Sequence, residues 1–207
     1  MKILAVCLGA PETLPGRKAK TGINKHAVNA TVMIDEEGLL RDAICNREHH
    51  GGRDQAVYVE GSRTWEWWAK ELGRPLEPGA FGENLIIEGL DNCAVAVGDK
   101  FIAGDLVLEV TSARIPCATF AAKMGDPKFV KRYMQAGRPG IYCRVLHAST
   151  VRAGAAVTYI PYAGSRVTMP ELMAMLDRSP SREDRTRCLT TPIHHRLRAF
   201  LEGDPGG

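Results

Sequence analysis

Residues 84–112, NLIIEGLDNCAVAVGDKFIAGDLVLEVTS, contain four short apolar runs that decide the predicted fold. The runs NLIIE, CAVAV, DKFIA and LVLEVTS are separated by Gly89, Gly98 and Gly104. Short β runs that follow one another at turn-sized spacing are typical of antiparallel sheets and barrels. This stretch therefore predicts a mainly β fold.

Strands are also expected on both sides of this stretch. The opening residues MKILAVCLGA favour a strand that ends before Pro11, because the apolar run is too short for a signal sequence with a cleavage site. Further strands are expected at residues 28–35, 56–60, 141–148 and 156–161. A regular alternation of strand and helix is missing, so the sequence does not predict a Rossmann fold.

Helical spacing interrupts the β region in a few places. Helices are expected at residues 64–72, 118–124 and 127–137. Thr64 is the expected cap of the first, while Gly125 and Gly137 are expected to end the other two.

The chain becomes helical in character from Val167 onward. Three segments open with expected caps, which are Thr168 with Glu171, Ser181 with Asp184, and Thr191 before Pro192. We therefore predict a β domain over residues 1–165 and a small three-helix domain over residues 166–207.

Composition narrows the functional classes. The 207 residues include 27 Lys and Arg against 24 Asp and Glu, and the basic residues are scattered, which argues against a nucleic-acid-binding face. No segment approaches the roughly 20 apolar residues that span a bilayer. The six cysteines include no CxxC pair, so we expect free thiols in a reducing, cytoplasmic compartment rather than structural zinc or disulfides.

A glycine pair precedes the strand expected at residue 56. In HHGGRDQA, residues 49–56, Gly51 and Gly52 allow backbone N–H groups to form an anion-binding concavity beside His50. A tight turn between strands is the alternative, and it explains the glycine pair equally well.

The loop GAFGENL, residues 79–85, offers Glu83 and Asn84 directly ahead of an apolar strand. These side chains can hydrogen-bond the edge of a heterocycle, or they can cap the turn. Lys25 and Arg144, in other glycine-bearing segments, can bind a phosphate or a pterin carbonyl, or can lie in solvent.

Cys117 has the most distinctive setting of the cysteines. In SARIPC, residues 112–117, a strand is followed by Arg114, a rigid proline and Cys117 at the start of a helical stretch. A nearby guanidinium and a helix start both favour the thiolate, which is the form that binds a soft metal. A buried structural thiol is the alternative interpretation.

In this order the motifs resemble the MOSC family, the domain named from the C-terminal part of molybdenum cofactor sulfurases, and specifically its stand-alone YiiM-like bacterial branch. The resemblance covers about residues 20–160, and residues 167–202 resemble the three-helix domain of this branch. The matching positions include Thr21–Ile23 with Lys25, His50–Gly52 with Asp54, Phe81–Leu85, Val97–Asp99, Arg114 with Pro116 and Cys117, and Gly140 with Tyr142 and Arg144.

The resemblance implies a MOSC-type β-barrel and a molybdopterin-type molybdenum cofactor. It assigns Cys117 as the metal ligand and places Asp54 near the metal, so both are predicted to be catalytic. It also implies that Lys25, His50, Gly51, Gly52, Asn84, Arg114 and Arg144 bind the cofactor.

The resemblance further implies reduction of N-hydroxylated small molecules. The chain shows no flavin, haem or iron–sulfur motif, so a separate reductase is expected to supply the electrons. The alternative is a cofactor carrier or sulfur-handling module, although the chain is too short to include the pyridoxal-phosphate domain of full sulfurases. A β-barrel interaction protein without cofactor is a third possibility.

The sequence departs from the family pattern at one place. The family often has Gly-Asp before the His-Gly-Gly loop, whereas this chain has Arg41-Asp42. Arg41 adopts a positive φ less readily than glycine. We therefore expect a different shape for the loop at residues 41–49, with consequences for substrate selection rather than for metal binding.

Overall fold

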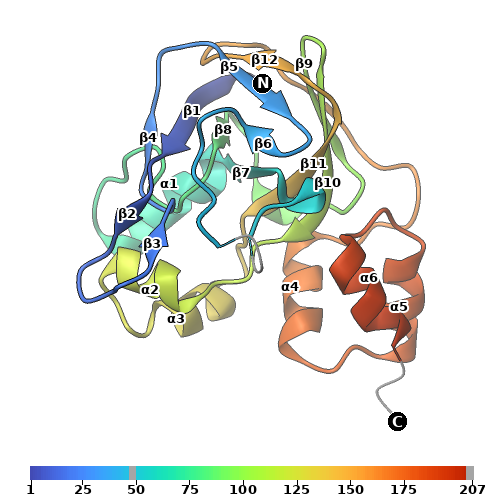
Figure 1. Ribbon diagram of the computed structural model, residues 1–207. Helices are drawn as coiled ribbons and strands as arrows, with labels where there is room; N and C mark the ends of the chain where they lie inside the picture. Colours follow the sequence, from blue (N-terminus) through green and yellow to red (C-terminus); the bar gives the residue numbers. More distant parts are fainter. Residues whose placement is uncertain (47–49, 204–207) are drawn as a thin grey trace.

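The computed structural model describes residues 1–46 and 50–203. Its main sheet consists of β1 (Ile3–Gly9), β4 (Lys25–Ala27), β7 (Val57–Gly61), β8 (Leu85–Ile87), β9 (Lys100–Ala103), β10 (Leu106–Ala113), β11 (Ile141–His147) and β13 (Thr158–Ile160). The strand order is β13-β9-β10-β11-β7-β8-β1-β4 (Figure 1). Neighbouring strands are antiparallel, apart from the parallel pair β7 and β8. The sheet dominates the fold as predicted, but six helices among the described residues make the fold more mixed than the prediction of a mainly β fold.

The sheet is curled but open, which corrects the predicted barrel. Strands β4 and β13 form its two edges, and within residues 1–46 and 50–203 no ladder joins them. Instead, residues 1–3 bond to the segment that leads into β13: the amide of Ile3 donates to Ala155 O, and that of Val157 to Met1 O, both at 2.9 Å. These bonds form an isolated bridge rather than a continuing strand pair, so the sheet bends without closing.

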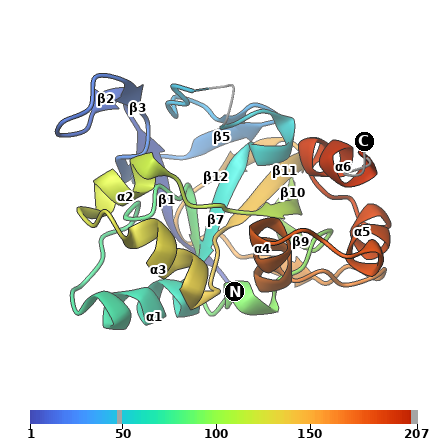
Figure 2. The same cartoon turned by 90° about the horizontal axis from the view of Figure 1, so that it is seen from below.

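Short strands form two further, separate sheets. Strand β5 (Val32–Asp35) lies between β12 (Ser149–Val151) and β6 (Gly38–Leu39), and β2 (Glu12–Thr13) pairs with β3 (Lys20–Thr21). Figure 2 shows the β2–β3 hairpin standing out from the body of the molecule.

The run CAVAV does not form the predicted strand. Its first residues enter a short 3-10 helix, η2 (Asn92–Ala94), because the Asp91 carboxylate accepts the Cys93 amide at 3.0 Å. The valines that follow are buried, and their backbones bond to the C-terminal region: Val97 N donates to Val167 O, and Met169 N to Val95 O, each at 2.9 Å. Apolar residues in a buried connection carry the same sequence signal as a strand.

The helices form two groups on opposite sides of the sheet. Helices α1 (Ser62–Leu72), α2 (Ala118–Met124) and α3 (Phe129–Ala136) form one group, and α4 (Met169–Asp177), α5 (Arg182–Leu189) and α6 (His195–Glu202) form the other (Figures 1 and 2). Among the residues that the structure describes, no helix is long and apolar enough to cross a bilayer. The boundary predicted at residue 165 stays a prediction, and residues 204–207 lie outside the described part.

The predicted helix ends are confirmed where the signal is local. Gly125 and Gly137 end α2 and α3 with φ of 68° and 63°, and Thr168 and Ser181 form complete capping boxes. Two predicted caps are wrong. Thr64 lies inside α1 and bonds to the η2 segment, and α6 begins only at His195, after the His194 cap.

An aromatic cluster fixes α1, α2 and α3 against the sheet. Its buried rings contact one another at centroid distances of 5.0–6.2 Å and belong to Trp68, Phe81, Phe120, Phe129 and Tyr133. Because Phe120 is part of this cluster, the start of α2 is held in place. That start carries Cys117.

Candidate functional site

A cavity of about 540 Å³ opens between the β2–β3 hairpin, the loop after β6, strand β7 and the start of α2. This volume lies within the range of small-molecule and cofactor sites. Most of the residues predicted from the sequence line it, namely Lys25, His50, Gly51, Asn84, Arg114 and Cys117. Gly52, Asp54 and Arg144 are absent from this lining.

Cys117 caps α2 and is partly exposed at the cavity. Burial acts to raise the pKa of its thiol, but hydrogen bonds from the His50 side chain and the Phe120 amide, together with the charge of Arg114, lower that pKa to about 7. A large share of the sulfur is therefore thiolate at neutral pH, which is the form that binds metals. Cys7 and Cys143 are buried core thiols instead, and Cys188 is also buried.

Arg114 places a buried positive charge beside this thiolate. The residue is 5% exposed, and its Nη1 donates to the phenol oxygen of Tyr58 at 3.2 Å and to Phe81 O. The guanidinium also lies 3.7 Å from the centre of the Phe120 ring. No salt bridge to Arg114 occurs in the described part of the chain. A buried cation of this kind favours an anionic ligand.

Lys25 and Asn84 meet at Asp42, which sequence reasoning noted only as part of the departure from the family. Lys25 Nζ forms an ion pair with Asp42 Oδ2, and Asn84 Nδ2 donates to the same oxygen at 2.8 Å. The Gly9 amide donates to Asp42 Oδ1 at 2.8 Å. Asp42 thus fixes two lining side chains, and the signal for it was its place in the Arg41-Asp42 pair ahead of the His-Gly-Gly loop.

Arg41 adopts the backbone conformation that glycine favours, despite its side chain. Its φ is 75°. Among the residues that the structure describes, no other residue except glycines has a positive φ. The loop therefore turns at residue 41 as a glycine would, at the cost of some backbone strain. The predicted difference in the shape of the loop at residues 41–49 stays a prediction, and residues 47–49 lie outside the described part.

The glycine pair before β7 adopts positive φ as well, with 75° at Gly51 and 81° at Gly52. Gly51 lines the cavity, whereas Gly52 precedes the short 3-10 turn η1 (Arg53–Gln55). The geometry requires glycine for the turn itself, and the predicted anion-binding role stays a prediction. His50 lines the cavity, and His49 lies outside the described residues.

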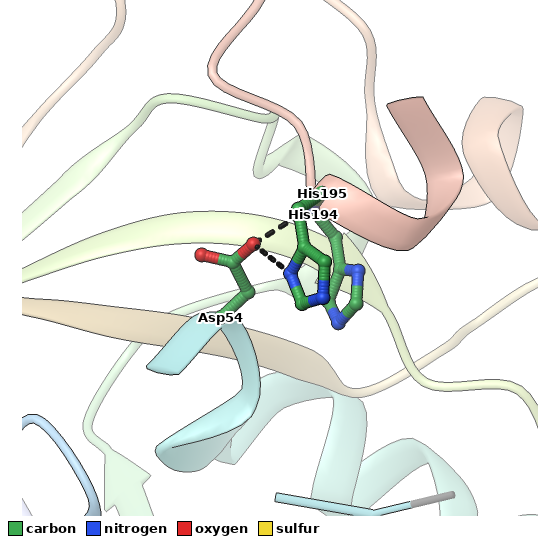
Figure 3. A group of neighbouring side chains, drawn as sticks. All are labelled: Asp54, His194 and His195. Carbon is green, nitrogen blue, oxygen red and sulfur yellow. Dashed lines mark hydrogen bonds and ion pairs between the residues drawn. The ribbon is translucent and has the colours of Figure 1, made fainter. Parts of the chain in front are cut away.

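Asp54 and Arg144 join the sheet to α6 rather than face the cavity. Asp54 Oδ1 lies 3.0 Å from Arg144 Nε, and Oδ2 accepts the His195 amide at 2.7 Å and lies 2.8 Å from His195 Nδ1 (Figure 3). Burial acts to raise the pKa of Asp54, but the hydrogen bonds from His195 and the charge of Arg144 lower it. The catalytic role predicted for Asp54 stays a prediction.

The same carboxylate, with His194 and His195, brings three possible metal-ligand atoms within 4.8 Å of one another. The two imidazoles are stacked at 4.6 Å with planes 17° apart (Figure 3), so their lone pairs lie in two separate, nearly parallel planes. A metal binds imidazole in the ring plane, and one ring would have to turn before both could reach one ion. Arg144 also balances the carboxylate charge. The arrangement therefore fits a hydrogen-bonded connection between the sheet and α6 better than a cation site.

Comparison with known proteins shows the family of the chain. A family model of the MOSC domain matches residues 46–158, and the chain belongs to the MOSC domain family. The Bacillus subtilis protein YflK is 38% identical over 155 residues, which cover 74% of this chain and 70% of that protein. The crystal structure of YiiM from Geobacillus stearothermophilus superimposes with a TM-score of 0.79 at 25% identity and covers 97% of each chain.

A Gibberella moniliformis protein named "Reductase" is also similar. It is 30% identical over 155 residues, which cover 71% of this chain but 27% of that protein. This chain therefore corresponds to about a quarter of the fungal relative.

Proposed function

We propose that this protein binds a molybdenum cofactor through Cys117 and reduces N-hydroxylated small molecules with electrons from a separate reductase. The family and a relative named as a reductase support a molybdenum-cofactor-associated function. The observation that carries the finer proposal is the thiol of Cys117, with a pKa of about 7, lining a ligand-sized cavity beside the buried charge of Arg114.

The residues present fit such a cofactor. A molybdopterin-type group combines a soft metal centre with an anionic phosphate, and the cavity offers a thiolate and a buried guanidinium. Arg17 and Lys20 of the β2–β3 hairpin add positive charge at the lining. Asn84 and the Gly51 backbone contribute polar groups for a heterocycle.

The chain's own residues have distinct tasks in this proposal. Cys117 holds the metal, and His50 keeps its sulfur ionised through their hydrogen bond. Arg114 balances the anionic ligand, while Lys25 and Asn84, fixed by Asp42, shape the wall. When bound, the cofactor supplies the two-electron redox chemistry that the side chains lack.

The overall reaction consumes two electrons and two protons: R–NHOH + 2 e⁻ + 2 H⁺ gives R–NH₂ + H₂O. The N–O bond breaks, the oxygen leaves as water, and the nitrogen gains hydrogen. The electrons come from the separate reductase. The protons must reach the cavity from water or from side chains that line it.

The proposal is tested by measuring molybdenum and oxidised-pterin fluorescence in the purified protein, followed by reduction of an N-hydroxylated base analogue with an artificial electron donor. We expect bound cofactor and turnover. Bound cofactor without turnover of any N-hydroxylated compound would support the carrier function instead. Protein that contains no molybdenum after expression with an excess of the metal would contradict both.

A further inference from the structure

A buried carboxyl group stands behind the wall of the cavity. Glu60 lies on β7, is 1% exposed, and shares a face of the strand with Tyr58, two residues earlier. Tyr58 lines the cavity. The proposed binding of the cofactor makes no use of Glu60. No ion pair to Glu60 occurs among residues 1–46 and 50–203, and a buried carboxyl group in that setting calls for an explanation.

Hydrogen bonds connect one side of the Glu60 carboxyl group to the cavity. The Tyr58 hydroxyl lies 2.9 Å from Glu60 Oε2, and Arg114 Nη1 donates to the same hydroxyl at 3.2 Å. On its other side, Glu60 Oε1 accepts from Asn92 Nδ2 at 2.6 Å, and Asn92 also donates to Pro139 O at 2.9 Å. The phenol of Tyr58 is therefore the link between the carboxyl group and the cavity.

We propose that Glu60 stores one of the two protons used in N–O bond reduction and passes it to the cavity through the Tyr58 hydroxyl. This inference rests on the proposed function. The Tyr58 O–H bond breaks as its proton moves to the departing oxygen of the substrate, and the Glu60 Oε2–H bond breaks as its proton replaces it. The second proton comes from water, and the separate reductase supplies both electrons. Water in the open cavity then returns a proton to Glu60 through the same hydroxyl.

The surroundings of Glu60 suit a stored proton. Burial and the charge of Glu83 raise the pKa of Glu60 to about 8, while hydrogen bonds from Tyr58 and Asn92 and the charge of Arg114 act in the opposite direction. A carboxyl group with that pKa is protonated at neutral pH and close to the range in which general acids work best. The polar and titratable groups facing it are Tyr58, Glu83, Asn92, Cys93, Arg114 and Tyr133.

The first test needs neither cofactor nor activity. Carboxyl ¹³C NMR of cofactor-free protein labelled at glutamate follows the ionisation of Glu60, whose signal is the one that disappears in Glu60→Gln. We expect a titration midpoint near pH 8, and a higher midpoint in Tyr58→Phe, which removes a hydrogen bond to the carboxylate. A midpoint near the ordinary value of 4.5 would overturn the proposal. Tyr58→Phe also identifies the signal should Glu60→Gln fail to fold.

The second test follows the rate of N-hydroxy reduction against pH. Glu60→Gln keeps a neutral side chain that donates toward Tyr58 but cannot release a proton, and we expect its rate to fall about 100-fold. The wild-type rate should fall as pH rises past about 8, where Glu60 loses its proton, and this limb should vanish in the variant. Combining Tyr58→Phe with Glu60→Gln should cost little more than either change alone, because both break one path.

Glu109→Gln is the matched control. Glu109 is another mostly buried carboxylate, on β10, and it faces Arg144 at 3.7 Å and Lys100 at 3.9 Å outside the cavity lining. Its variant should keep the wild-type rate and pH profile. Wild-type behaviour of Glu60→Gln would overturn the proton-transfer role. If the protein reduces no N-hydroxylated compound, the proposed function is refuted. The titration midpoint from NMR would still report the protonation of Glu60 independently of that result.

Discussion

Burial and the hydrogen bond from His50 act in opposite directions on the ionisation of Cys117. Burial opposes ionisation, whereas the His50 hydrogen bond is the largest influence that lowers the pKa of the thiol to about 7. Because the thiolate is the nucleophile, its alkylation reports this pKa in the absence of any metal.

We expect iodoacetamide to modify Cys117 of the cofactor-free protein with a rate that rises through about pH 7 and levels off above it. His50→Ala should raise the pKa of Cys117 and slow its alkylation at pH 7 several-fold. Peptide mass spectrometry distinguishes Cys117 from the other cysteines. The control is His26→Ala, on exposed β4, which should change nothing. Equal alkylation rates for wild type and His50→Ala would refute this role of His50.

The positive φ of Arg41 also belongs to the residue scale. Replacement by glycine relieves backbone strain of roughly 1 kcal/mol or more, while the added flexibility of the unfolded chain costs about 0.5–1 kcal/mol. We therefore expect Arg41→Gly to be neutral or to raise the free energy of unfolding by up to about 1 kcal/mol, measured by urea denaturation. The same change at exposed Arg63, in the first turn of α1, should lower it by up to about 1 kcal/mol. A loss at Arg41 as large as at Arg63 would contradict the strain.

At the scale of elements, close packing of β7 against the entry to β11 holds Tyr58 in the cavity wall. A Cβ atom at Gly140 would lie 2.2 Å from Cε2 and 2.4 Å from the hydroxyl oxygen of Tyr58. The family motif therefore has a physical reason at this position, since the glycine lets the phenol lie against the backbone.

Gly140→Ala should displace the Tyr58 ring and lower the free energy of unfolding by about 1–3 kcal/mol, as overpacking does. Urea denaturation gives the value. Gly203→Ala is the control, because a Cβ there meets nothing nearer than 3.4 Å and should change stability little. Undiminished stability of Gly140→Ala would show that the ring moves freely, contrary to the packing described.

The success of sequence reasoning differed between elements for a physical reason. Helix ends at Gly125 and Gly137 and the boxes at Thr168 and Ser181 depend on residues a few positions apart, so the sequence contains the whole signal. Residues 93–97 instead pair with residues 167–169, a partner 70 positions away that no local pattern specifies. Local patterns also cannot tell an open sheet from a closed barrel, because strands of both show the same alternation of apolar and polar residues.

The candidate site was predictable in its chemistry more than in its connections. Cys117, Arg114 and His50 were found because their residue types and order match a family motif. Glu60 and Tyr58 were missed because AVYVE reads as an ordinary strand, and only the burial of Glu60 and its bond to Tyr58 distinguish it. Arg144 was predicted to bind the cofactor, and this stays a prediction. Its guanidinium lies against Asp54 and donates to Pro192 O, just before α6.

At the scale of the whole molecule, Asp54 connects the sheet to α6 (Figure 3). Hydrogen bonds from His195 and the charge of Arg144 depress the pKa of Asp54 against the effect of burial. A carboxylate with a depressed pKa stabilises the fold fully above its ordinary value of 3.8, and this contribution is lost as pH falls through the lower value in the folded protein.

Asp54→Asn should lower the free energy of unfolding at neutral pH by about 1.5–3 kcal/mol, the range for hydrogen bonds to charged groups. Amide hydrogen exchange should increase most in α6, and stability should depend less on pH below about 4 than in wild type. Asp177→Asn, at an exposed position at the end of α4, is the control and should leave both unchanged. If amide exchange in α6 is the same in Asp54→Asn as in wild type, the hydrogen bonds of Asp54 are not needed to hold α6 against the sheet.

The most direct test of the central claim is the molybdenum content of wild type and Cys117→Ala, purified in parallel after expression with an excess of the metal. Cys45→Ala is the matched control, since Cys45 also lines the cavity but has no assigned role. We expect wild type and Cys45→Ala to retain molybdenum and Cys117→Ala to lose it, with all three equally folded by circular dichroism. Equal molybdenum in Cys117→Ala and wild type would contradict the assignment of Cys117 as the metal ligand.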